Sequence, residues 1–162
     1  EGLGGVVVPQ EIERKFLLKN DGWRSMGIGT KYRQGYLSTV SERTVRIRLI
    51  NDQGYLTVKG ISVGARRAEY EYEIPAGEAS EMLDNLCEHP LIEKRRYRVE
   101  YQSLIWEIDE FDGDNAGLVV AEVELEDENQ VVHMPDWVGE EVTADPRYYN
   151  ANLTTNPYSR WC

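Results

Sequence analysis

Apolar and polar residues alternate along most of the chain, which is the pattern of half-buried β-strands. Successive side chains of a strand point to opposite faces, so each alternating run has one apolar face and one polar face. Eight strands are therefore predicted, at residues 10–18, 31–37, 43–50, 54–60, 67–74, 92–100, 104–112 and 118–126.

Helical spacing is confined to short segments. Residues 78–87 have apolar side chains on one helical face, and a short helix is expected near Trp23. A last helix is expected after Asp145-Pro146, because Asp is a good N-cap and Pro suits the first helical position. The chain is thus α+β but mainly β.

Turn residues separate several of the strands. Residues 51–54 predict a hairpin turn, and residues 112–117 form another turn-rich connection. Short strands joined by tight turns predict an antiparallel sheet, and closing it into a barrel would remove its exposed edges. We expect one domain over residues 9–162, preceded by a tag remnant or disordered start at residues 1–8.

Composition narrows the class of protein. The 162 residues are 41% hydrophobic and 29% charged, as in a globular domain. The net charge of −11 disfavours nucleic acid and anionic membranes as partners, and no apolar run approaches the roughly 20 residues of a membrane helix. Nothing resembles a signal peptide, and Cys87 and Cys162 are expected to be reduced thiols, so a cytoplasmic location is expected.

The charged residues on the polar faces occur in pairs of like sign. On any single strand, a solvated face is the ordinary explanation. Like charges two residues apart nevertheless repel unless ions of opposite sign offset them. A divalent cation carrying a polyphosphate would satisfy both signs. The pairs are Glu11/Glu13, Arg46/Arg48, Glu71/Glu73, Lys94/Arg96, Glu107/Asp109 and Glu122/Glu124.

The order of these pairs resembles the CYTH superfamily, also called triphosphate tunnel metalloenzymes. Glu11-Ile12-Glu13-Arg14-Lys15 matches the ExExK signature, and the basic and acidic pairs follow in the family's sequence, with Lys59 between the second and third. Residues 33–37 and 139–153 resemble the second strand and the C-terminal segment of short bacterial members. The resemblance covers residues 9–155.

This resemblance implies a closed eight-stranded antiparallel barrel that forms a tunnel with charged side chains inside. The apolar faces would then point outward, covered by a few helices and in part by a second subunit, which would make a homodimer. The implied activity is divalent-metal-dependent hydrolysis of a triphosphate, most simply inorganic tripolyphosphate to pyrophosphate and phosphate, with Mg²⁺ or Mn²⁺. Adenylate cyclase, nucleoside or thiamine triphosphatase, and a non-catalytic polyphosphate-binding module are the alternatives.

The resemblance also implies roles for the charged residues. Lys94 would stabilise charge near the scissile phosphate, and Tyr36 would contact substrate or water, although packing is the commoner role of a strand tyrosine. Internal salt bridges are the structural alternative for the charged groups. The metal ligands would be Glu11, Glu13, Glu122 and Glu124; the phosphate-binding residues Lys15, Arg46, Arg48, Lys59 and Arg96; and the supporting carboxylates Glu71, Glu73, Glu107 and Asp109.

Overall fold

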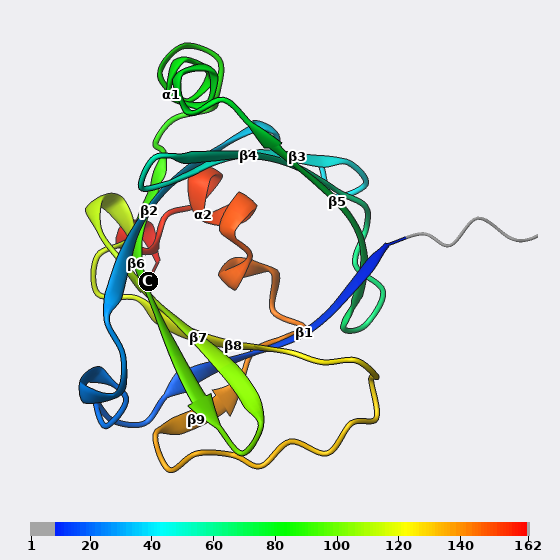
Figure 1. The fold of residues 1–162 in the computed structure, drawn as a ribbon, viewed down its shortest axis with the longest axis vertical. Coiled ribbons are helices and arrows are strands. Elements are labelled where there is room, and N and C mark those ends of the chain that lie inside the picture. Colours follow the sequence, from blue (N-terminus) through cyan, green and yellow to red (C-terminus); the bar gives the residue numbers. More distant parts are fainter. Residues whose placement is uncertain (1–8, 162) are drawn as a thin grey trace, which may run out of the picture.

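One antiparallel sheet closes on itself in the computed structural model, which describes residues 9–161 (Figure 1). The described residues form nine strands in the order β5-β4-β3-β2-β6-β7-β8-β1-β9, and a further pairing of β1 with β5 closes strands β1 to β8 into a barrel. The strands are β1 (Gln10–Leu18), β2 (Gly29–Ser38), β3 (Thr44–Ile50), β4 (Gln53–Lys59), β5 (Arg66–Ile74), β6 (Ile92–Tyr101), β7 (Leu104–Phe111), β8 (Val119–Glu124) and β9 (Val138–Glu141).

All eight predicted strands are present, with ends that differ from the predicted ones by up to two residues. The hairpin turn between β3 and β4 contains Asn51, whose φ of 52° is left-handed, a conformation that Asn tolerates well. The strand β9 was not predicted, because Val-Gly-Glu-Glu is too short to show alternation. It pairs with β1 outside the closed ring. The expectations for residues 1–8 and for Cys162 lie outside the described residues.

Helices occur where the sequence predicted them. The helix α1 (Ala76–Asn85) starts and ends two residues before the predicted segment, and the 3₁₀ turn η1 (Arg24–Met26) follows Trp23. After Asp145 come η3 (Pro146–Tyr148) and α2 (Asn150–Thr155). The remaining turns are η2 (Gly113–Asn115) and η4 (Tyr158–Arg160). Within residues 9–161, no helix combines the length and the apolar character needed to cross a bilayer.

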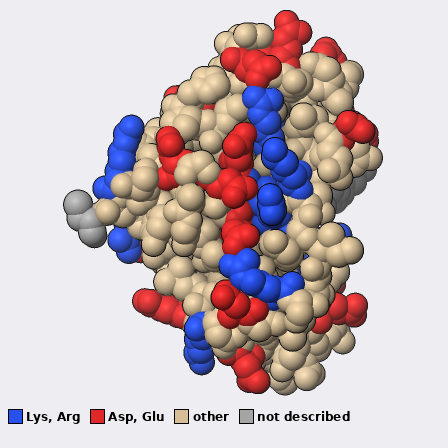
Figure 2. Space-filling view, turned by 90° about the vertical axis from the view of Figure 1, so that its left-hand side faces the viewer, with Lys and Arg blue, Asp and Glu red and all other residues tan. Residues whose placement is uncertain are grey.

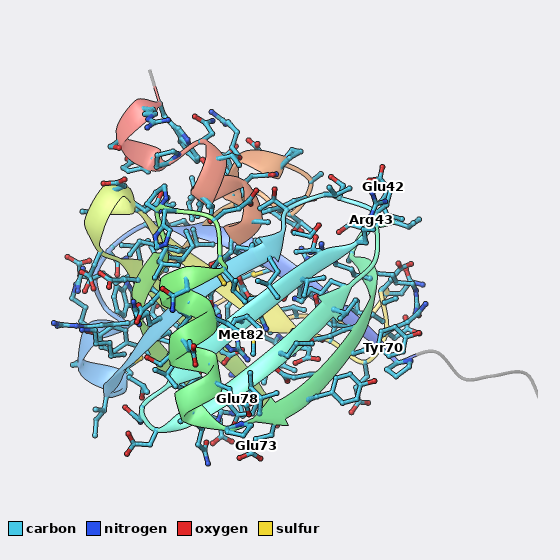
Figure 3. All side chains as sticks on the ribbon, turned by 90° about the horizontal axis from the view of Figure 1, so that it is seen from above. Glu42, Arg43, Tyr70, Glu73, Glu78 and Met82 are labelled. Carbon is cyan, nitrogen blue, oxygen red and sulfur yellow. The ribbon has the colours of Figure 1, made fainter. Side chains whose placement is uncertain are left out.

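The apolar faces of the strands point outward and are covered by other segments of the same chain. Helix α1 packs across the outer face of β3 and β4, where Ala79 and Leu83 meet Ile47 (Figures 1 and 3). On the opposite side, Trp106 of β7 contacts Trp137 with ring centroids 5.7 Å apart. Segments of the same chain thus cover these two parts of the outer face.

Charge is present on the outside of the barrel as well. Figure 2 shows acidic and basic side chains interleaved on the outer surface over β2 and β6. Arg33 of β2 forms an ion pair with Asp84 of α1, and Arg24 lies 2.6 Å from Glu110 of β7. Charge alternation in the sequence therefore does not by itself identify the inward face, which the closure of the barrel decides.

Candidate active site

The barrel encloses a cavity of about 630 Å³. The segment with η3 and α2 lies within the ring of strands in the view down the barrel and contributes Pro146 and residues 149–152 to the cavity wall (Figure 1). The charged lining is balanced, with seven acidic and seven basic side chains, whereas the whole chain carries −11. They are Glu11, Glu13, Glu69, Glu71, Glu107, Glu122 and Glu124, and Lys15, Arg46, Arg48, Lys59, Arg67, Lys94 and Arg96.

Carboxylates gather where β1 pairs with β8. The register places Glu13 opposite Glu124 and Lys15 opposite Glu122, so that all four side chains point inward. The pKa of Glu13 is raised to about 7, mainly by withdrawal from water and then by the charges of Glu122 and Glu11, although Lys15 and Lys59 oppose the rise. Burial and the neighbouring carboxylates also raise the pKa of Glu124. This side of the cavity therefore carries more negative charge than its own lysines offset.

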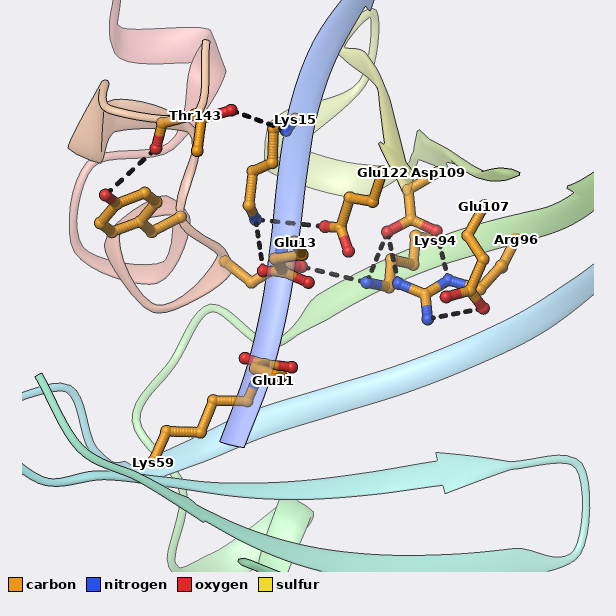
Figure 4. Close-up of polar contacts among 12 residues, drawn as sticks. Glu11, Glu13, Lys15, Lys59, Lys94, Arg96, Glu107, Asp109, Glu122 and Thr143 are labelled. Atoms are coloured by element: carbon orange, nitrogen blue, oxygen red, sulfur yellow. Dashed lines mark hydrogen bonds and ion pairs between the residues drawn. The ribbon is translucent and has the colours of Figure 1, made fainter. Parts of the chain in front are cut away.

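Two lysines partly compensate these carboxylates. The Nζ of Lys15 donates to Glu122 at 3.1 Å, and the Nζ of Lys59 donates to Glu11 at 2.6 Å (Figure 4). Although burial opposes it, Lys15 holds the pKa of Glu122 well below its usual value. Glu122 and Glu11 thus have close cationic partners, while the carboxylate of Glu13 lies 3.9 Å from the Nζ of Lys15.

Basic residues gather on the part of the wall formed by β3 and β6. Burial, together with the neighbouring Arg46 and Arg96, lowers the pKa of Arg48 to about 10. The Nε atoms of Arg46 and Arg48 are buried without a hydrogen-bond partner. Their shared carboxylate is Glu71, 3.1 Å from Arg48 and 3.7 Å from Arg46, with a side chain 37% exposed. These cations are arranged to accept a further anion.

Lys94 lies between the two groups and is buried. Its Nζ donates to Oδ2 of Asp109 at 2.8 Å and to Oδ1 of Asn150 at 3.1 Å (Figure 4). Asp109 also accepts from Nε and Nη2 of Arg96, at 2.7 and 2.9 Å. Because burial outweighs the attraction of a carboxylate shared with Arg96, the pKa of Lys94 falls to about 7. Although burial opposes it, Arg96 and Lys94 together lower the pKa of Asp109.

Most residues singled out from the sequence line this cavity. Tyr36 lines it and is buried, and its hydroxyl accepts from Gln34 at 3.4 Å. Asp109 lies beneath Lys94 and Arg96 rather than at the cavity surface.

Glu73, unlike the buried Asp109, is exposed as well as outside the lining (Figure 3). The structure thus places Glu73, near the end of β5, outside the cavity whose residues we expected it to support. Arg98, on the same face of β6 as Lys94, is exposed and does not line the cavity.

Some lining residues were missed from the sequence. Arg67 and Glu69 share the inward face of β5 with Glu71, so the same alternation would have found them. Asn150 gave no such signal, because it reaches Lys94 only when α2 folds back against β2 and β6. Tyr32 is an inward aromatic residue on β2, which by pattern alone resembles a packing residue.

Among residues 9–161, no three His, Cys, Asp or Glu side chains are gathered closely enough to form a complete metal site. The carboxylates nevertheless suit a hard divalent cation. Mg²⁺ is commonly held by one or two carboxylates together with substrate phosphates and water, rather than by a full set of protein ligands. The raised pKa of Glu13 marks the place where a cation would relieve repulsion between carboxylates.

Comparison with known proteins gives consistent matches over nearly the whole chain. The model of the CYTH domain matches residues 9–156. An inorganic triphosphatase of Acetivibrio thermocellus is 55% identical over 152 residues, which cover 94% of this chain and 97% of that protein. An inorganic triphosphatase of Nitrosomonas europaea is 38% identical, covering 88% and 95%. A crystal structure of an inorganic triphosphatase, 34% identical, superposes with a TM-score of 0.63 over 89% of this chain and 97% of its own.

Proposed function

The chain belongs to the CYTH domain family, and we propose that it hydrolyses inorganic tripolyphosphate to pyrophosphate and phosphate with a divalent metal ion. The observation that carries this proposal is the balanced lining of the cavity, with crowded carboxylates on β1 and β8 and crowded cations on β3 and β6. A bare anion would need only the cations. A metal–triphosphate complex carries both signs and would satisfy both groups.

The basic residues would bind the phosphate oxygens. Arg46 and Arg48 both line the cavity and share the single carboxylate of Glu71, and Arg guanidinium groups bind phosphate in fixed geometry. Binding a polyanion would offset the repulsion among Arg46, Arg48 and Arg96. Lys15 and Lys59 would complete the set, each with its Nζ on a carboxylate at the edge of the acidic group. Arg67, on the same wall, is an additional candidate.

The carboxylates of β1 and β8 would hold the metal ion. Burial, followed by the neighbouring carboxylates, raises the pKa values of Glu11, Glu13 and Glu124, and Glu122 lies beside them. Oxygen ligands of this kind suit either Mg²⁺ or Mn²⁺. When bound, the ion would supply positive charge to the phosphate oxygens and orient them.

Lys94 would act closest to the reaction. Asp109 and Asn150 hold its Nζ at the cavity wall between the acidic and basic groups. An ammonium fixed there can stabilise charge that develops on phosphate oxygens as the anhydride bond breaks, which is the main demand of phosphoryl transfer. Tyr36 lines the same cavity and would contact substrate or water. Glu71 and Glu107 would orient the arginines that they contact.

The alternatives share the same cavity chemistry. An adenylate cyclase, a nucleoside triphosphatase or a thiamine triphosphatase would need room and contacts for an organic group as well. A non-catalytic polyphosphate-binding module would need cations more than crowded carboxylates. The two curated relatives, at 55% and 38% identity, both carry the name inorganic triphosphatase, and this favours tripolyphosphate.

A substrate comparison tests the proposal. Phosphate release is measured from tripolyphosphate, ATP, thiamine triphosphate and pyrophosphate, with Mg²⁺ and with Mn²⁺. We expect the highest kcat/KM for tripolyphosphate, pyrophosphate as a poor substrate, and no release in EDTA. Faster turnover of ATP, or cyclic AMP as the main product, would refute the assignment to inorganic triphosphate.

The cytoplasmic location, the homodimer and the absence of nucleic-acid binding stay predictions. The net charge of −11 opposes binding to nucleic acid. Sedimentation of the purified protein over a range of concentrations measures the oligomeric state.

A further inference from the structure

Tyr32 lies at the centre of the basic group. Its ring centroid is 5.0 Å from Cζ of Arg96, 5.4 Å from Cζ of Arg48 and 5.8 Å from Nζ of Lys94. All three cations line the cavity, and each has a proposed role toward phosphate. The ring is buried at the cavity wall, with 9% of the residue exposed.

The sheet register brings these groups together without any loop. β2 lies between β3 and β6, and Tyr32 pairs with Lys94 on one side and with Ile50 on the other. Arg96 is two residues from Lys94 on β6, and Arg48 is two residues from Ile50 on β3. Both arginines therefore point to the same face of the sheet as Tyr32. Diagonal neighbours of this kind remain within reach of aromatic and long side chains.

Holding these cations together without an anion is unfavourable. Asp109 contacts both Lys94 and Arg96, and the pKa of Arg48 is lowered in part by Arg96. A carboxylate at the position of the Tyr32 ring would relieve the repulsion among these cations, but it would also repel the phosphate. The face of an aromatic ring attracts cations through its quadrupole and has no net charge. Tyr32 can therefore hold the cations while leaving them able to bind an anion.

We propose that Tyr32 is a positioning residue whose ring face holds Arg48, Lys94 and Arg96 in place for the triphosphate. The proposal rests on the proposed function for the identity of the anion. In this role Tyr32 acts electrostatically, through the face of its ring. A packing role would depend on the shape of the side chain, and a hydrogen-bonding role would depend on its hydroxyl.

Replacing Tyr32 by phenylalanine and by progressively fluorinated phenylalanines separates these roles. Fluorine withdraws electron density from the ring face and changes its shape little. The dissociation constants are measured by calorimetry for tripolyphosphate with Ca²⁺, and for inorganic phosphate alone as a probe that needs no turnover. Tyr55 of β4 serves as the matched control, since its ring reaches one of these cations, Arg48, at 6.0 Å.

We expect Tyr32→Phe to bind tripolyphosphate within about 2-fold of the unmodified protein, and affinity to fall stepwise with fluorination to about 10-fold weaker for the pentafluoro ring. The same substitutions at position 55 should leave the dissociation constants nearly unchanged. Dissociation constants that do not change with fluorination at position 32 would overturn the proposal. A large loss of affinity in Tyr32→Phe would also overturn it, because the role would then belong to the hydroxyl. If fluorination weakens phosphate binding but the unmodified protein does not hydrolyse tripolyphosphate, the proposed function fails and the role of Tyr32 stands.

Discussion

The Nζ of Lys94 lies 2.8 Å from Oδ2 of Asp109, and both side chains are about 1% exposed. The same carboxylate holds Arg96 through two further hydrogen bonds. One buried negative charge thus fixes two buried cations of the proposed site. Removing a single member of such a group is costly, because the charges left behind cannot return to water.

Asp109→Asn should destabilise the protein by about 3–5 kcal/mol, measured by urea unfolding at pH 6. The loss should be smaller at pH 9, because Lys94, whose pKa is about 7, is then largely neutral and needs no counter-charge. The control is Asp84→Asn, which removes an exposed partner of Arg33 and should cost less than about 1 kcal/mol. Equal losses of unfolding free energy in the two variants would show that the buried Lys94–Asp109 pair contributes no more to stability than the exposed pair.

Lys94→Met should lower kcat for tripolyphosphate by about 100-fold and change KM much less. A group that stabilises developing charge acts mainly in the transition state. Lys31→Met is the matched control, since Lys31 is an exposed residue on the neighbouring strand β2. An effect of Lys94→Met confined to KM would make Lys94 one more phosphate-binding residue.

Asn150→Asp should move the alkaline limb of the kcat/KM profile upward. The pKa of Lys94 is lowered to about 7, so the protonated form is lost as pH rises above that value, and kcat/KM should fall with it. A carboxylate at position 150, where Oδ1 lies 3.1 Å from Nζ, would favour the ammonium and raise that pKa. Asn152→Asp, on the same helix, controls for added charge. If the two variants have identical profiles of kcat/KM against pH, titration of Lys94 does not cause the alkaline limb.

Glu13→Gln should abolish activity and yet stabilise the protein in EDTA at pH 8. The folded-state pKa of Glu13 is raised from 4.5 to about 7, so folding favours the protonated form. Its contribution to stability is therefore present below pH 4.5 and is lost as pH rises through 7. The amide keeps the shape and removes this loss. The melting temperature should rise relative to the parent at pH 8 but not at pH 4.5.

Glu100→Gln, at an exposed position of β6, is the control for this pair of measurements and should show neither effect. If Glu13→Gln retains near-normal activity at limiting Mg²⁺, Glu13 is not a metal ligand.

Metal and tripolyphosphate should stabilise the fold jointly. Because the lining is balanced, neither ion alone satisfies both groups. With Ca²⁺ and tripolyphosphate at about 100-fold above Kd, the expected gain is about 2.7 kcal/mol, measured by calorimetric melting. Tripolyphosphate in EDTA should give much less. A combined shift no larger than the sum of the separate shifts would contradict a metal–triphosphate complex as the ligand.

The sequence by itself determined the strands and the residues that share a face. A period of two places Arg46 beside Arg48, and Glu122 beside Glu124, wherever the strand lies. Those local rules gave eight of the nine strands in the described residues and most of the charged lining of the cavity. Together with the ExExK pattern at Glu11, they carried the resemblance to the family that the comparisons confirm.

Only the tertiary structure decided which charges work together. Glu71 lines the cavity, while Glu73, two residues further along the same face of β5, lies outside the lining. Asn150 reaches Lys94 across 56 positions of sequence, and Tyr32 meets three cations through the register of β2 with two neighbours. Local sequence fixes the face on which a side chain lies. The partners across the barrel depend on hydrogen-bonded pairings between distant segments, which no local period encodes.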